Sequence, residues 1–155
     1  GDHAGQFGWF CKGTMYENSI RVPLIISTSN DLSESGSHTK HVVNNLSLYD
    51  TILKFCQIEH TTDTDGRELQ PLLREPELDE WSDITYSELP GSCMINNGEF
   101  KLIRKSISED RCVAELYDMG EEVLDGTNLW DRPEFQEQQE ELFEKLDNHM
   151  SHSNE

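Results

Sequence analysis

The fold class is decided by the stretch Arg21-Val22-Pro23-Leu24-Ile25-Ile26-Ser27. Its aliphatic run has no polar interruption, which is typical of a strand buried on both faces of a parallel sheet. Pro23 fits near the start of such a strand, where a missing N–H is tolerated. The stretch therefore predicts a strand over residues 22–27 that belongs to a large α/β sheet.

The residues before this strand form a segment rich in glycine and aromatic side chains. Its members are Gly1, Gly5, Phe7, Gly8, Trp9, Phe10 and Gly13. Glycine at this density suits a loop whose backbone turns tightly or comes close to a ligand. Residues 1–19 are therefore predicted to form a loop of this kind.

The residues after the strand predict a helix and then an antiparallel sheet. Apolar residues recur at helical spacing over about 42–57, whereas residues 59–82 are polar and contain prolines. A turn at Asn96-Asn97-Gly98 is a good hairpin signal between residues 92–95 and 99–103. The expected strands are 84–89, 92–95, 99–103 and 113–117.

A second helix is predicted to close the chain. Asp131 is expected to be its N-cap, with Pro133 in the first turn and Glu134 three residues after the cap. An apolar stripe then follows at helical spacing, which should pack on the sheet. The stripe consists of Phe135, Leu142, Phe143, Leu146 and Met150.

The net charge of the chain limits the classes of partner that it is expected to bind. The 155 residues contain 31 Asp and Glu against 12 Lys and Arg, a formal net charge of -19. Such a surface repels phosphate backbones and anionic lipids, so nucleic acid and membranes are not expected partners. An anion site must therefore be built locally from few cations. The sequence opens at Gly1 without methionine and indicates no localisation; cytoplasmic, periplasmic and secreted locations all fit.

Residues 8–26, Gly-Trp-Phe-Cys-Lys-Gly-Thr-Met-Tyr-Glu-Asn-Ser-Ile-Arg-Val-Pro-Leu-Ile-Ile, resemble the sulfatase family of the alkaline-phosphatase superfamily. In that family a glycine-rich loop, a lysine, a Tyr-Glu pair and an Arg-Val-Pro-Leu-Ile strand follow one another at this spacing. Three later blocks also resemble the family, so that the resemblance covers nearly the whole chain in order. They are Tyr49 with Thr51 to Leu53, Asp65 to Leu73, and Glu115 to Asp118 with Asn128 and Leu129.

The resemblance implies the C-terminal part of an arylsulfatase-like or choline-sulfatase-like enzyme. Its α/β, alkaline-phosphatase-like fold would be represented here by the edge of the large sheet, a small antiparallel sheet and the C-terminal helix. Residues 1–58 would then end the catalytic α/β domain, and residues 59–155 would form a C-terminal subdomain. One strand and one helix cannot form a doubly wound sheet by themselves, which agrees with a part of something larger.

The family also implies a divalent cation, calcium, held partly by an Asp-His pair just before the glycine-rich loop. Placing Gly1 directly after that pair keeps Asp2, Gly5, Gly8 and Lys12 at the family's positions, and puts the metal ligands upstream of this chain. A second register makes Asp2 and His3 the ligand pair, but it requires a deletion of three residues. We favour the first register.

The resemblance assigns chemistry to Lys12. In sulfatases the lysine of the Lys-Gly-Thr-x-Tyr-Glu segment points at the sulfate oxygens, where a compact cation offsets negative charge. Lys12 is therefore the predicted catalytic and substrate-binding residue; the alternative from the pattern alone is an exposed lysine at a loop end. Glu17 and Arg21 are predicted to be a structural pair that holds the loop against the strand, or else to support the site indirectly.

The family's nucleophile is a formylglycine made from the Cys or Ser of a Cys-x-Pro/Ala-x-Arg motif, and this motif is absent. None of Cys11, Cys56, Cys93 and Cys112 has an arginine at the required offset. We therefore expect residues 1–155 to be inactive alone and to need the N-terminal half of the same enzyme to hydrolyse a small sulfate ester. Two alternatives stay open: a phosphonate or phosphate ester hydrolase of the same superfamily, and a non-catalytic remnant domain.

Overall fold

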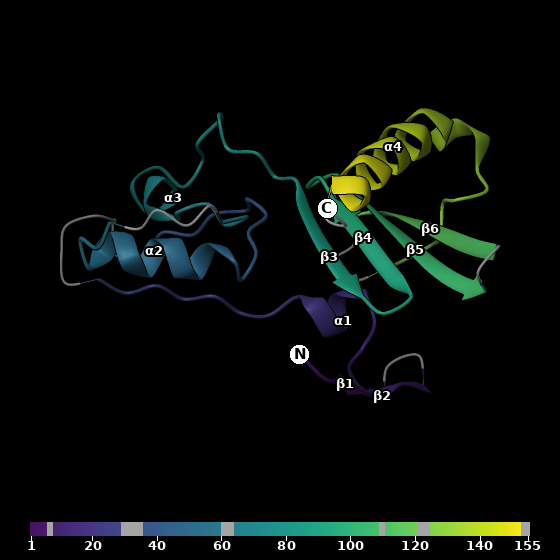
Figure 1. The fold of residues 1–155 in the computed structure, drawn as a ribbon, viewed down its shortest axis with the longest axis horizontal. Helices are drawn as coiled ribbons and strands as arrows, with labels where there is room; N and C mark the ends of the chain where they lie inside the picture. The colour runs from purple at the N-terminus through teal and green to yellow at the C-terminus, as the bar shows by residue number, and fades with distance from the viewer. Residues whose placement is uncertain (6–7, 29–35, 60–63, 109–110, 121–124, 153–155) are drawn as a thin grey trace. The chain divides into compact units, whose positions relative to one another are not determined.

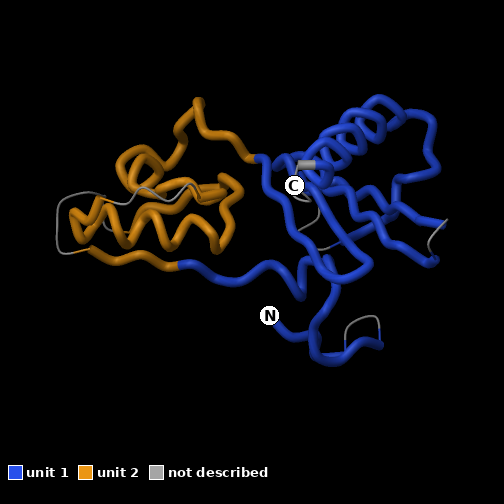
Figure 2. Tube along the Cα trace, viewed as in Figure 1, with its two compact units in different colours: residues 1–24, 84–155 blue, residues 25–83 orange. Residues whose placement is uncertain are grey.

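The structure is a computed structural model that describes residues 1–5, 8–28, 36–59, 64–108, 111–120 and 125–152 (Figure 1). The chain forms two units, which are coloured separately in Figure 2. The first unit combines residues 1–24 with residues 84–155, and the second comprises residues 25–83. The predicted boundary between residues 58 and 59 falls inside the second unit and stays a prediction.

The first unit is built on a four-stranded antiparallel sheet. Neighbouring strands follow the chain order, so that each pair is joined by a short connection (Figure 1). All four predicted strands are confirmed, and one extends to Ser108, five residues beyond its predicted end. The strands are β3 (Thr85–Leu89), β4 (Ser92–Asn96), β5 (Phe100–Ser108) and β6 (Arg111–Asp118).

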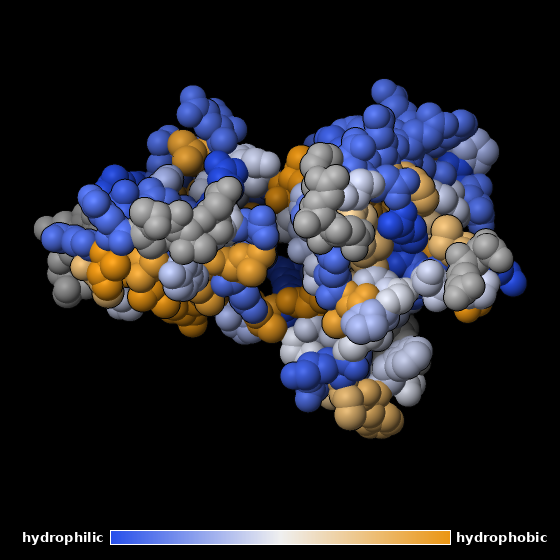
Figure 3. Space-filling model, viewed as in Figure 1, coloured by the Kyte–Doolittle hydropathy of each residue, from blue (hydrophilic) through white to orange (hydrophobic). Residues whose placement is uncertain are grey.

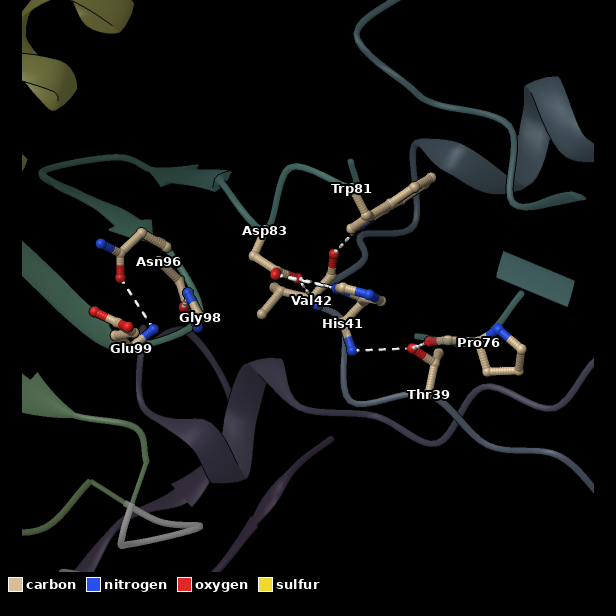
Figure 4. Close-up of polar contacts among 10 residues, drawn as sticks. Thr39, His41, Val42, Pro76, Trp81, Asp83, Asn96, Gly98 and Glu99 are labelled. Carbon is tan, nitrogen blue, oxygen red and sulfur yellow. Dashed lines mark hydrogen bonds and ion pairs between the residues drawn. The ribbon is translucent and has the colours of Figure 1, made fainter. Parts of the chain in front are cut away.

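The hairpin between β4 and β5 forms at the predicted turn. The side-chain oxygen of Asn96 accepts a hydrogen bond from the Gly98 N–H at 2.8 Å (Figure 4). The side-chain oxygen of Asn97 accepts a second one from the Phe100 N–H at 2.8 Å. These asparagines satisfy backbone donors that the turn would otherwise leave to water. They set the register that pairs Ile95 with Leu102.

One face of the sheet is covered by helix α4 (Gln136–His152). Leu142 and Leu146 of the helix are buried against Ile95 and Leu102 of the strands and share their hydrophobic core. The predicted stripe is thereby confirmed, since Phe135, Phe143 and Met150 pack around the same core.

The start of this helical segment differs from the prediction. A short 3-10 turn, η2 (Pro133–Phe135), precedes α4, and its cap residue is Arg132 without a side-chain hydrogen bond. Proline has a fixed φ and no N–H, so it begins the helical turn and makes the residue before it the cap. Asp131 is therefore not the N-cap.

The opposite face of the sheet receives the N-terminal residues. Strands β1 (His3–Ala4) and β2 (Phe10–Cys11) form a small antiparallel ladder, and the one-turn helix α1 (Glu17–Ile20) follows. Met15, only 1% exposed, packs with Met94, Ile103 and Tyr117 in a second core. Because side chains alternate along a strand, Met94 and Ile103 face away from the α4 core. The sheet is thus covered on both faces.

The second unit is a small helical body. It contains α2 (Ser47–Phe55) and α3 (Gln70–Arg74), packed around Leu69, Leu72 and Trp81. The predicted helix over 42–57 is confirmed at its centre, and it is shorter at both ends. The Thr51 hydroxyl links the two helices, because it donates to the Ser47 carbonyl at 2.6 Å and accepts the Leu69 N–H at 2.9 Å.

A polar cluster fixes the segment before α2 in the second unit. Asp83 accepts the Val42 N–H at 2.6 Å and lies 3.1 Å from Nδ1 of His41 (Figure 4). The Trp81 indole N–H donates to the Val42 carbonyl at 3.2 Å. These contacts satisfy buried polar groups around a tryptophan that is 8% exposed.

The strand predicted over residues 22–27 is not formed by the described residues. The segment has no strand assignment, and Ile25 is 90% exposed. An aliphatic run indicates burial, but a strand also needs a neighbour that accepts and donates its backbone hydrogen bonds. No described segment of this chain pairs with it. Among the described helices, none is long and apolar enough to span a bilayer.

Candidate functional site

Lys12, the predicted catalytic residue, follows directly after β2. The ladder pairs His3 with Cys11, which brings the neighbouring residues Asp2 and Lys12 together. The Lys12 Nζ lies 3.9 Å from the Asp2 Oδ1, and the two side chains are 76% and 66% exposed. Such an exposed pair contributes little free energy. The ammonium of Lys12 is therefore accessible at the end of this ladder.

The backbone around Lys12 turns sharply. Cys11 has a φ of 66° and Gly13 a φ of 106°, so both residues beside Lys12 adopt positive φ values. A residue with a β-carbon would be strained at the Gly13 value, whereas glycine reaches it readily. The turn directs the chain from β2 to Thr14 and to the buried Met15.

His3 lies inward, unlike the neighbouring Asp2. It is 4% exposed, and its Nε2 lies 2.7 Å from the Thr14 hydroxyl, so the ring fastens β1 to the segment after Lys12. Calcium takes about six to eight oxygen ligands. Within the described ranges no three His, Cys, Asp or Glu side chains gather into a possible metal site. Asp2 and His3, which contact a lysine and a threonine, do not fit a calcium site by themselves.

Glu17 belongs to a cluster of three charged residues inside the first unit. Its Oε1 lies 2.8 Å from the Nζ of Lys101 on β5, and Lys101 also forms an ion pair with Asp125. The second carboxylate oxygen of Asp125 accepts the Glu17 backbone N–H at 2.6 Å. The side chains of Glu17, Lys101 and Asp125 are 7%, 0% and 3% exposed. We call these three residues the buried ion cluster.

Arg21, the predicted partner of Glu17, contacts Glu17 through the backbone. The Arg21 N–H donates to the Glu17 carbonyl at 2.8 Å and ends α1 as its C-cap. Two side chains four residues apart meet on a continuous helix. Here the helix ends at Ile20 and Arg21 has an extended backbone, so the Glu17 carboxylate is directed at Lys101.

A second cluster of polar side chains lies beside the buried ion cluster, and we call it the Tyr16 network. Lys105 Nζ donates to Tyr16 Oη and to Glu115 Oε1, both at 2.7 Å, while the Tyr117 hydroxyl donates to Glu115 Oε2 at 3.1 Å. Burial lowers the pKa of Lys105, but its hydrogen bonds to Glu115 and Tyr16 outweigh this and raise the pKa overall. Burial, with the charge of Glu115, raises the pKa of Tyr117.

Sequence reasoning missed Lys101 and Asp125. A weak signal was present, because Lys101 shares one face of β5 with Ile103, and a face with a central isoleucine is normally buried. Asp125 lies outside any strand or helix, where no pattern marks it. A surface cavity of about 560 Å³ lies elsewhere in this unit, beside residues 130–133 and the first half of α4, and contains none of the predicted site residues.

A comparison with known protein families identifies the family of this chain. The model of the family described as N-sulphoglucosamine sulphohydrolase, C-terminal, matches residues 5–152. The chain belongs to this sulfatase family. Lys12 and all three members of the buried ion cluster lie within the matched residues of the sulfatase domain.

Individual relatives of the sulfatase domain agree with the family. This chain is 29% identical over 154 residues to the N-acetylglucosamine-6-O-sulfatase of Bacteroides thetaiotaomicron. The match covers 92% of this chain and 27% of that protein. An arylsulfatase of Clostridium perfringens is 31% identical over 90 residues, 57% of this chain and 18% of its own length. The chain therefore spans less than a third of either relative.

A solved structure confirms the predicted fold class. A protein in complex with its substrate, D-glucosamine-2-N,6-O-disulfate, superimposes with a TM-score of 0.83 and 28% sequence identity. The match covers 97% of the sulfatase domain and 32% of that chain.

Proposed function

We propose that residues 1–155 form the C-terminal portion of a sulfatase, and that Lys12 is the residue of this portion that contacts the sulfate. Family membership and the names of both relatives support the reaction class. The observation that carries the role of Lys12 is its exposed ammonium at the end of a ladder whose neighbouring residues are anchored. It is also the only lysine or arginine before Arg21 in a chain of net charge -19.

Lys12 would act electrostatically. Negative charge grows on the oxygens around sulfur as the S–O bond breaks, and a fixed ammonium stabilises this charge more than it stabilises the bound ester. Lysine suits the role because its charge is compact and its three donors rotate. The surrounding acidic surface increases the need for such a cation, because it otherwise repels an anionic substrate.

The remaining machinery would come from outside this chain. We propose a formylglycine nucleophile there, since residues 1–155 contain no Cys-x-Pro/Ala-x-Arg motif. Calcium ligands would also come from there, since no three His, Cys, Asp or Glu side chains of the described residues gather into a possible metal site. The partner of this domain would then be the rest of the same enzyme, and the domain alone would be inactive. A sulfated glucosamine is the first substrate to test, because the relative named above is an N-acetylglucosamine-6-O-sulfatase.

The test compares Lys12→Ala with Lys54→Ala in the intact sulfatase. Lys54 is a matched control, since its side chain is 59% exposed and pairs with the partly exposed Glu68 at 3.6 Å. We expect Lys12→Ala to lower kcat by about 10²–10³ with a smaller change in KM, the size typical of one lost electrostatic contact. Lys54→Ala should leave both constants unchanged.

An unchanged kcat in Lys12→Ala would overturn the assignment of Lys12. A phosphate ester with the same leaving group, measured in parallel, decides between sulfate and phosphate as the preferred anion. Residues 1–155 alone should show no turnover above the buffer blank at any calcium concentration. Turnover by this chain that disappears in Lys12→Ala would contradict the proposed division of the site.

A further inference from the structure

We infer that the buried ion cluster of Glu17, Lys101 and Asp125 positions Lys12 for catalysis, so that these three are positioning residues of the site. The inference rests on the proposed role of Lys12. It concerns contacts that the sequence did not indicate, between segments 84 and 108 residues apart.

The cluster ties the start of α1 to the sheet through charge. Lys101 has no exposed surface, and both carboxylates around it are almost fully buried. Removing one partner from a buried ion pair leaves an uncompensated charge, which is strongly unfavourable. Glu17 therefore cannot leave the sheet without leaving Lys101 with one partner fewer. The Glu17 backbone is held as well, because its N–H donates to Asp125.

The anchors continue along the chain toward Lys12. Each residue between Gly13 and Glu17 has a contact that fixes it: Thr14 with His3, Met15 with the second core, and Tyr16 with Lys105. Lys12 is the first residue beyond these anchors whose side chain is mostly exposed, and its pair with Asp2 is weak. The position of its ammonium thus depends on backbone that the cluster and its neighbours hold.

Charge, rather than apolar packing, suits this task. Replacing a buried ion pair by well-packed hydrophobic residues is often neutral or stabilising, so the cluster is a poor device for stability alone. Hydrogen bonds are directional, and two of them, from Lys101 to the Glu17 carboxylate and from the Glu17 N–H to Asp125, act together with the Lys101–Asp125 ion pair. A displacement of about 1 Å in a catalytic group can cost about 10² in rate. Holding Lys12 in one position therefore contributes more to the reaction rate than additional stability would.

A double-mutant cycle in the intact sulfatase tests the inference. Lys101→Met and Glu17→Gln are each measured alone and together with Lys12→Ala. The matched control is Arg104→Met, because Arg104 lies on the opposite face of the same strand and pairs with Asp147 of α4. If the cluster acts through Lys12, each cluster variant lowers kcat by about tenfold or more, with little change in KM. Adding Lys12→Ala should then lower kcat no further than Lys12→Ala does alone.

If the effects of Lys101→Met and Lys12→Ala on kcat multiply in the double variant, the inference is overturned, since independent residues behave additively in free energy. The control should multiply with Lys12→Ala in this way. If Lys101→Met does not fold, Glu17→Gln decides the cycle, because it keeps the shape of the side chain and a hydrogen-bonding group. Thermal unfolding of each variant shows which ones are folded.

Hydrogen exchange of the backbone amides in residues 13–17 provides a reading that does not depend on activity. We expect exchange there to be faster by about tenfold or more in Glu17→Gln and unchanged in Arg104→Met. Exchange equal to that of the wild type would overturn the anchoring. If instead Lys12→Ala leaves kcat unchanged while exchange responds, the proposed role of Lys12 has failed and the anchoring has not.

Discussion

Gly66 lies against the main chain of Leu46, at the start of α2. A β-carbon at Gly66 would lie 2.5 Å from the Leu46 carbonyl oxygen and 2.5 Å from Asp50 Oδ2. Real β-carbons essentially never approach backbone atoms this closely, so only glycine lets the loop pass the helix here. The Asp65-Gly66 block of the family resemblance therefore has a steric cause within the second unit.

Gly66→Ala should destabilise the protein by about 1–3 kcal/mol, the range for forcing extra atoms into a packed site. The Leu46 carbonyl belongs to the backbone and cannot rotate away as a side chain could. Gly120→Ala is the control, since its β-carbon would meet the Asp118 carboxylate at 3.3 Å, a side-chain oxygen that can shift by a few tenths of an ångström. Urea unfolding of both variants checks this. Equal midpoints for the two variants would contradict the close approach.

Leu146→Ala should destabilise the protein by about 2–5 kcal/mol, because it removes buried volume where α4 meets the sheet. Leu146 has no exposed surface and belongs to the core around Ile95 and Leu102. Ile107→Ala on β5 is the matched control, because Ile107 is 60% exposed. Chemical unfolding should show a large shift only for Leu146→Ala, and a shift of the same size in both would mean that α4 does not cover this sheet.

Alkaline pH should weaken the fold through the Tyr16 network. The pKa of Tyr117 is raised by burial and by Glu115, and the pKa of Lys105 is raised because its hydrogen bonds outweigh burial. The folded state thus holds both protons more tightly than the unfolded state. The stability that these groups contribute is fully present below about pH 10 and is lost as the pH rises through their folded pKa values.

The free energy of unfolding should therefore fall above about pH 10, and Tyr117→Phe should reduce this fall because it removes one of the two titrating groups. Tyr49→Phe is the control, since Tyr49 is 52% exposed. Urea titrations from neutral to alkaline pH provide the measurement. A fall of the same depth in Tyr117→Phe and the wild type would refute this role of the hydroxyl.

Residues 1–155 alone should self-associate through the apolar surface of the second unit. Hydrophobic side chains gather along one side of this unit (Figure 3). Large hydrophobic residues of the unit are exposed, among them Ile25, Leu46, Tyr49 and Ile52, by 90%, 55%, 52% and 58%. Exposed apolar patches of this kind promote association. Sedimentation velocity should show oligomers that decrease in Ile52→Lys, whereas Ile107→Lys in the first unit leaves them unchanged. A monomeric wild type in dilute buffer would exclude this behaviour.

The sheet was predictable because its strands are short segments with apolar residues and its central turn is specific. Asn96-Asn97-Gly98 indicated the hairpin, and consecutive residues on both faces of β4 and β5 are buried beside it. The extension of β5 was missed, because Arg104, Lys105 and Ser106 are all polar and leave no alternating pattern. The run at 22–27 indicated burial, whereas Val22, Leu24 and Ile25 are exposed by 45%, 42% and 90%. No single run of residues specifies which segment will pair with it.

The candidate site was predictable only where local sequence carries it. Lys12 was found through the neighbours that make its segment resemble a sulfatase, whereas Lys101 and Asp125 reach Glu17 from distant parts of the chain. Ion pairs between distant segments leave no periodic signal, because each member is an ordinary charged residue in its own surroundings. Glu17 was predicted to pair with Arg21 or to support the site indirectly, and its contact with Lys101 could be named only from the structure.

The separation of Glu17 from Asp125 also has a consequence for biosynthesis. A ribosome adds about 5–20 residues per second. The 108 residues between these two positions therefore take roughly 5 to 20 s to translate at that speed. Until Asp125 is translated, the segment that bears Lys12 cannot form all of its contacts with the sheet, although this segment was translated much earlier. A nascent chain that stops short of Asp125 cannot assemble the anchor, so docking of this loop on the sheet marks a chain translated almost to helix α4.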